Sequence, residues 1–140
     1  MSQVRSVLIV DDNPADVEIA KLLLSESGCY GEIYSVSDGR EAFELFNGES
    51  AVDGLGTAFP PTLILLDLNM PRMNGFEFLE AYSTLDREGE PPVVVVLSSS
   101  SAVEDRERIE VHDVVHGFLT KPITIPAAIE LASQLNATNG

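Results

Sequence analysis

The strongest constraint on the fold is a series of short aliphatic runs separated by longer stretches with helical patterning. Three runs consist wholly of Val, Leu and Ile, at residues 7–10 (VLIV), 63–66 (LILL) and 93–97 (VVVVL), and two mixed runs lie at 33–36 and 117–119. Runs without polar alternation are typical of strands buried on both faces of a parallel sheet. Short apolar runs also occur in helix cores, but the flanking Pro and Asp residues and the β-branched content favour strands here.

The stretches between the runs predict five helices. In the first, Asn13 is the expected N-cap, Pro14 the first helical residue and Gly28 the stop signal. The other four are expected at residues 39–46, 76–85, 102–111 and 126–135. The alternation predicts an α/β protein, a (βα)₅ doubly wound parallel sheet with helices on both faces. We expect a single domain over residues 1–140, with no output domain attached.

Composition narrows the classes of partner. The 140 residues include 23 acids and 8 bases, which gives a net charge of −15. Such a surface repels nucleic acid and anionic membranes, so we expect neither as a partner. No apolar stretch is long enough for a membrane span or a signal peptide, and the single Cys29 excludes an internal disulfide framework. A cytoplasmic location is therefore expected.

Polar residues follow four of the five runs, where the carboxyl ends of parallel strands bind ligands. They are Asp11 and Asp12, then Asp67, then the serines at 98–101, and finally Lys121. If the first and third strands are neighbours, three mutually repelling carboxylates converge. A hard divalent cation removes that conflict, and an oxygen-only site favours Mg²⁺. With Lys121 as a second positive charge, the arrangement suits phosphoryl transfer to a carboxylate nucleophile.

Four motifs occur in order at the ends of the expected strands. They are residues 7–13 (VLIVDDN), 65–71 (LLDLNMP) with Gly75, the hydroxyl of Ser98, and 120–122 (TKP). Through them the chain resembles the receiver domain of two-component response regulators along nearly its whole length. The resemblance implies a flavodoxin-like fold with strand order 2-1-3-4-5. Residues 13–17 and the long connector at 47–61 are similar to the small regulators paired with bacterial phytochromes.

The resemblance also implies a role for each position. Asp67 is the expected phosphoacceptor, and its donor is a sensor histidine kinase. Mg²⁺ is expected on the side chains of Asp12 and Asp67, on the backbone carbonyl of Asn69, and on Asp11 through water. 

Ser98 is expected to hydrogen-bond the phosphoryl oxygen, and Lys121 to pair with the phosphoryl group. The bond from Lys121 to Pro122 is expected to be cis, as only X-Pro bonds readily are. Ser98 and Phe118 are the expected switch residues, although Phe118 is also an ordinary core residue.

These expectations describe a phosphoacceptor signalling protein and not an enzyme. The protein is nevertheless expected to assist its own phosphorylation and dephosphorylation. It would signal through phosphorylation-dependent contacts with a downstream protein target or with a phosphotransfer protein. The last helix has an apolar arc of about 200°, twice what packing on a sheet needs, and so predicts a partner surface. A homodimer through the face of the fourth and fifth helices is the leading case.

Two other protein classes share parts of the pattern. A Mg²⁺-dependent phosphatase of the haloacid-dehalogenase type also uses an Asp nucleophile, but it requires a second acid where this chain has Asn69. A flavodoxin-type flavin carrier requires a hydroxyl-rich phosphate loop where this chain has Asp11 and Asp12. An effector, a phosphorelay intermediate and a phosphate sink all fit the sequence equally well.

Overall fold

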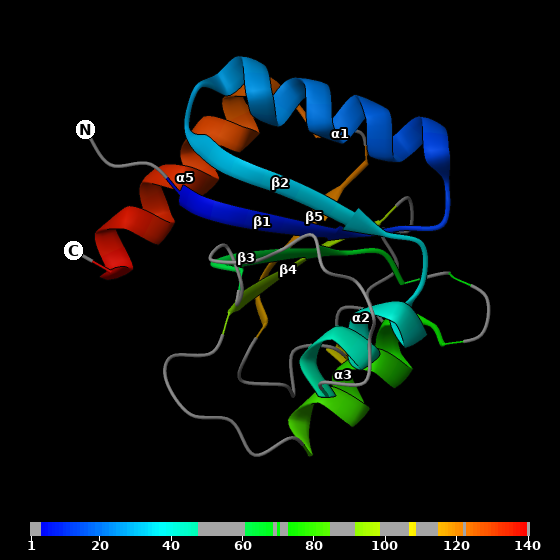
Figure 1. The fold of residues 1–140 in the computed structure, drawn as a ribbon. Coiled ribbons are helices and arrows are strands. Elements are labelled where there is room, and N and C mark those ends of the chain that lie inside the picture. Colours follow the sequence, from blue (N-terminus) through cyan, green and yellow to red (C-terminus); the bar gives the residue numbers. More distant parts are fainter. Residues whose placement is uncertain are drawn as a thin grey trace.

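A five-stranded parallel sheet in the order β2-β1-β3-β4-β5 forms the centre of the molecule (Figure 1). The computed structural model describes residues 4–47, 61–68, 70, 73–84, 92–98, 107–108, 115–121 and 123–139. The strands are β1 (Val4–Val10), β2 (Tyr30–Val36), β3 (Leu63–Leu66), β4 (Val93–Ser98) and β5 (Val115–Thr120). The helices are α1 (Pro14–Ser27), α2 (Gly39–Asn47), α3 (Gly75–Ser83) and α5 (Ile125–Asn139). The predicted fold class and strand order are confirmed.

The helices cover both faces of the sheet. Helices α1 and α5 lie on one face, and α2 and α3 lie on the other (Figure 1). Two apolar clusters fill the two layers, and all four residues of β3 are buried between them. This explains why residues 63–66 carry no polar alternation, since both faces of the central strand are covered. None of the described helices combines the length and the apolar character needed to cross a membrane.

The start of α1 follows the predicted capping pattern. The side chain of Asn13 accepts hydrogen bonds from the backbone N–H groups of Ala15 at 3.0 Å and Asp16 at 3.2 Å. Pro14 occupies the first turn, where its missing N–H costs nothing. Gly28 ends the helix in the left-handed conformation with φ 73°, which glycine adopts without strain.

The boundaries of several strands and helices differ from the predicted ones. Strands β1 and β2 each begin three residues before the predicted runs. In β1 residues 4–6 alternate between buried and exposed, and in β2 a buried Tyr30 is followed by two exposed residues, so neither start carries a continuous apolar signal. Helix α5 runs from Ile125 to Asn139, four residues beyond its predicted end. Helix α3 ends at Ser83, where the N–H of Thr84 bonds to the carbonyl of Ala81 at 3.1 Å.

The expected fourth helix at residues 102–111 falls mostly outside the described residues. Of this stretch the structure describes residues 107–108, which are helical. Arg108 places its guanidinium 3.7 Å from the centre of the Phe76 ring, so the side chain of Arg108 lies against the start of α3.

Candidate functional site

Three carboxylates meet at the carboxyl edge of the sheet. Strands β1 and β3 are hydrogen-bonded neighbours with Val10 paired to Leu66, so the residues that follow them, Asp11 and Asp67, lie side by side. The N–H of Asp67 donates to the carbonyl of Val10 at 2.9 Å and fixes this arrangement. Carboxylate oxygens of Asp11, Asp12 and Asp67 all lie within 4.8 Å of one another. The predicted convergence of the three carboxylates required the first and third strands to be neighbours, and they are.

The donor set of this cluster fits Mg²⁺. Asp11 and Asp67 are buried, with 5% and 6% exposure, while Asp12 is exposed and gives the cluster an open side. The cluster offers carboxylate oxygens, the hard ligands that Mg²⁺ prefers, and a bound cation would offset the repulsion among three carboxylates this close. Asn69, the remaining expected ligand, lies outside the described residues.

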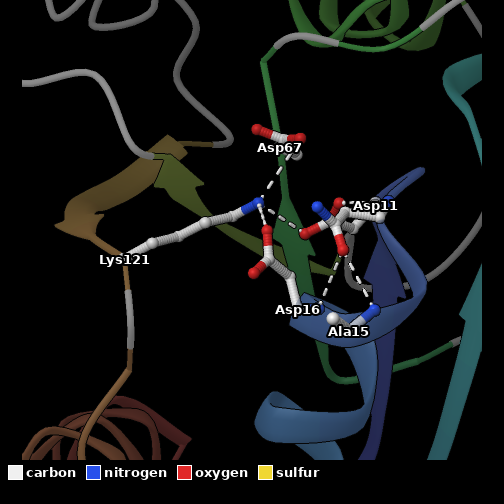
Figure 2. A network of polar contacts seen from close by, with 6 residues as sticks. Asp11, Ala15, Asp16, Asp67 and Lys121 are labelled. Atoms are coloured by element: carbon white, nitrogen blue, oxygen red, sulfur yellow. Dashed lines mark hydrogen bonds and ion pairs between the residues drawn. The ribbon is translucent and has the colours of Figure 1, made fainter.

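Lys121 supplies positive charge to the cluster from the end of β5. Its Nζ lies 2.7 Å from Asp11 Oδ2, 2.9 Å from Asp16 Oδ2 and 3.5 Å from Asp67 Oδ2 (Figure 2). Burial alone would lower the pKa of Lys121, but hydrogen bonds to Asp11 and Asp16 and the charges of Asp67 and Asp11 outweigh burial and raise the pKa above its usual value. Lys121 therefore stays positively charged at neutral pH.

Gly75 lets helix α3 start directly behind Asp67. Its N–H donates to the carbonyl of Leu68 at 3.0 Å. A Cβ at this position would lie 2.5 Å from the backbone oxygen of Asp67 and 2.9 Å from Cα of Leu68, closer than real Cβ atoms approach. Asn74 caps the helix and shares a capping box with Glu77, each bond 2.9 Å long. The backbone of Asp67 is thus held between β1 and the start of α3.

The remaining expected site residues are described only in part. Ser98 is the last residue of β4 and pairs with Thr120, but its side chain lies outside the described part of the chain. Phe118 is partly buried and packs against the cluster on the α2–α3 face, as expected of a core residue. Pro122 and residues 99–101 lie outside the described residues, and so does the expected cis bond.

Asp16 belongs to the polar network but was not predicted to. It lies in the first turn of α1, and its carboxylate lies on the side of Lys121 Nζ away from Asp67 (Figure 2). The available signal was its place in the first turn of α1, three residues after the N-cap Asn13, where acidic residues are favoured. Nothing in that position specifies a lysine 105 residues away as its partner.

Comparisons with known proteins agree on one family. The family model of the response regulator receiver domain matches residues 7–133. A two-component response regulator of Oryza sativa subsp. japonica is 34% identical over 104 residues, which are 69% of this chain and 41% of that protein. The chain therefore spans less than half of this relative.

Solved structures show the same likeness. A two-component response regulator from Cytophaga hutchinsonii superposes with a TM-score of 0.79 at 27% identity, covering 96% of this chain and 98% of that one. The bacteriophytochrome response regulator RtBRR superposes with a TM-score of 0.76 at 26% identity, covering 96% of this chain and 78% of that one. The predicted resemblance to regulators of bacterial phytochromes is confirmed.

Proposed function

Because the chain belongs to the response regulator receiver domain family, we propose that Asp67 accepts a phosphoryl group from a phosphohistidine of a sensor histidine kinase. A receiver domain is a signalling domain, not a classical enzyme. The observation that carries the proposal is the buried Asp67 carboxylate, which has oxygens of Asp11 and Asp12 within 4.8 Å and Lys121 Nζ at 3.5 Å.

The transfer would be an in-line displacement at phosphorus. An oxygen of Asp67 forms the new O–P bond, the P–N bond to the donor imidazole breaks, and the imidazole nitrogen keeps the electron pair and takes a proton. Positioning and charge neutralisation are most of what such a transfer requires. Lys121, charged and held at the site, would pair with the phosphoryl oxygens. The same groups would hold the acyl phosphate for attack by water, so the domain would assist its own dephosphorylation.

The transfer would depend on Mg²⁺. Asp12 and Asp67 would hold the ion directly, Asn69 would contribute its carbonyl oxygen, and Asp11 would contribute through water. Both oxygens of Asp11 already have protein partners, the N–H of Asn13 at 2.9 Å and Lys121 Nζ at 2.7 Å, which supports an indirect contact. The ion would offset the negative charge of the acids and of the incoming group.

Phosphorylation would change which proteins the domain contacts. We expect Ser98 to move toward the phosphoryl group and Phe118 to turn inward, which remodels the segment between them. The output would be a contact with a downstream target or a phosphotransfer protein, in a cytoplasmic setting and through a single receiver domain.

Helix α5 provides a candidate surface for that output. Ala128, Leu131 and Leu135 are buried against the sheet, whereas Ile129 is 46% exposed. Exposed apolar surface beside a buried face often marks an interaction site. A homodimer through this face remains the leading case.

Labelling with a small phosphodonor tests the proposal. Acetyl phosphate and Mg²⁺ should add one phosphoryl group to the parent protein, read by intact mass, and none to Asp67→Asn. Asp38→Asn is the matched control, because Asp38 is also a buried acid following a strand. Its Oδ1 accepts the N–H of Glu41 at 2.9 Å, and asparagine keeps that acceptor. Labelling of Asp67→Asn at the parent's level would contradict the assignment.

A further inference from the structure

Asp16 forms a contact that the proposed transfer does not use. The side chain of Asn13 accepts the N–H of Asp16 at 3.2 Å, which fixes this residue in the first turn of α1. Asp16 Oδ2 accepts a hydrogen bond from Lys121 Nζ at 2.9 Å. The close carboxylate group consists of Asp11, Asp12 and Asp67 and does not include Asp16. Asp16 therefore holds Lys121 without belonging to the expected metal ligands.

Lys121 has to divide its ammonium among three carboxylates. Its three N–H donors face partners at 2.7 Å (Asp11), 2.9 Å (Asp16) and 3.5 Å (Asp67), so the expected phosphoacceptor is the most distant of the three. Asp16 and Asp67 approach Nζ from different sides (Figure 2). Movement of Nζ toward a group on Asp67 would therefore lengthen its contact with Asp16.

The surroundings of Asp16 and Lys121 indicate an attraction of moderate strength between the two side chains. A hollow of about 20 Å³ beside the pair has room for about one water molecule. Its remaining walls are apolar: Ile19, Ala20, Leu97 and Ile123. Little water can thus replace Asp16 as a partner on this side. The side chain of Asp16 is nevertheless 37% exposed and that of Lys121 13%, so solvent screens part of the attraction.

We propose that Asp16 is a positioning residue that holds Lys121 back from Asp67 in the unmodified protein and competes with the phosphoryl group for its ammonium. This inference rests on the proposed function of Asp67. Modification of Asp67 does not remove the carboxylate of Asp16, so the competition persists in both states and lowers the affinity of the site for a phosphoryl group. Asp16, in the first turn of α1, would thus lower the fraction of molecules that are phosphorylated.

A double-mutant cycle separates this role from a general effect of charge. Four proteins are compared: the parent, Asp16→Asn, Lys121→Met and the double variant. Each is titrated at saturating Mg²⁺ with beryllium trifluoride, a mimic of a phosphoryl group on aspartate, and binding is followed by fluorine NMR. Competition through Lys121 predicts that Asp16→Asn raises affinity roughly two- to fivefold in the parent background and not in the Lys121→Met background.

Two further variants serve as controls. Asp16→Glu restores the carboxylate and should return the affinity toward that of the parent. Glu26→Gln removes one negative charge from an exposed position near the other end of the same helix and should leave the affinity unchanged. Urea unfolding of every variant is measured in parallel, because a purely structural tether between α1 and the end of β5 would alter stability without altering the affinity for the mimic.

The outcomes are distinguishable. If Asp16→Asn raises the affinity for the mimic equally in both backgrounds, the effect of Asp16 does not act through Lys121, and the inference is wrong. The inference is also wrong if Asp16→Asn raises the affinity in neither background. If the Lys121→Met proteins bind the mimic too weakly to measure, the nitrogen resonance of the Lys121 side chain decides. Competition requires the mimic to shift this resonance, and an unshifted resonance overturns it. A parent that fails to bind the mimic would instead overturn the function proposed for Asp67.

Discussion

Replacement of Gly75 by alanine probes how tightly the backbone of Asp67 is held. The new Cβ would lie 2.5 Å from the Asp67 carbonyl oxygen, roughly 1 Å short of an ordinary contact of about 3.5 Å. The two nearest obstructing atoms belong to the backbone, so rotation of the Leu68 side chain does not relieve the clash. Overpacking of this kind costs about 1–3 kcal/mol, more than the better helix propensity of alanine returns. We therefore expect a loss of about 1–2 kcal/mol in the free energy of unfolding.

Urea unfolding and phosphorylation rate together measure the effect. With a slope of about 2 kcal/mol per molar urea, the midpoint should fall by about 0.5–1 M. Because relief of the clash displaces Asp67 itself, the phosphorylation rate should also fall, by up to about a hundredfold for a 1 Å displacement. Gly117→Ala is the control, since nothing lies within 4 Å of a Cβ there, and it should be neutral or slightly stabilising. A Gly75→Ala protein with the parent's midpoint and rate would refute the reasoning.

Three further predictions concern the metal, the switch and the partner surface. Asp12→Ala removes an expected ligand and should weaken Mg²⁺ binding at least about tenfold in calorimetric titrations; unchanged affinity would place the ion elsewhere. Beryllium trifluoride should change amide exchange most within residues 98–118, and changes confined to α2 and α3 would contradict the Ser98–Phe118 switch. Ile129→Glu should dissociate a homodimer in sedimentation experiments, and a parent that is monomeric at high concentration with and without phosphodonor would disprove the dimer.

The acid cluster could be predicted from the sequence because residues that directly follow neighbouring parallel strands lie close together in space. Asp11 and Asp67 each follow a fully apolar run, and neighbouring parallel strands bring such positions together at one edge. The same reasoning missed Asp16, since helical periodicity describes the faces of one helix and not which side chain reaches it from another element. It also missed the first residues of β1, where buried Val4 and Ser6 flank exposed Arg5 and the run of apolar residues is broken.

The attachment of helix α5 to the sheet should make stability sensitive to alkaline pH. The hydroxyl of Tyr30, at the start of β2, donates to the carbonyl of Ala128 in α5 at 2.8 Å. Burial, with a smaller effect of the nearby Cys29 thiol, raises the pKa of Tyr30 above its usual value. A raised folded-state pKa means that the stabilisation is complete below about pH 10 and is lost as the pH rises toward the folded-state value, by up to about 1.4 kcal/mol per pH unit.

Tyr30→Phe removes both the hydrogen bond and the titration. At pH 7 the variant should lose about 0.5–1.5 kcal/mol, because the hydroxyl no longer satisfies the Ala128 carbonyl. Between pH 10 and 11 its stability should fall less steeply than that of the parent, since the tyrosine that titrates in the unfolded chain is gone. Other alkaline titrations occur in both proteins and cancel in the difference. Parallel pH profiles of urea-unfolding free energy for the two proteins would show that Tyr30 is not held neutral in the fold.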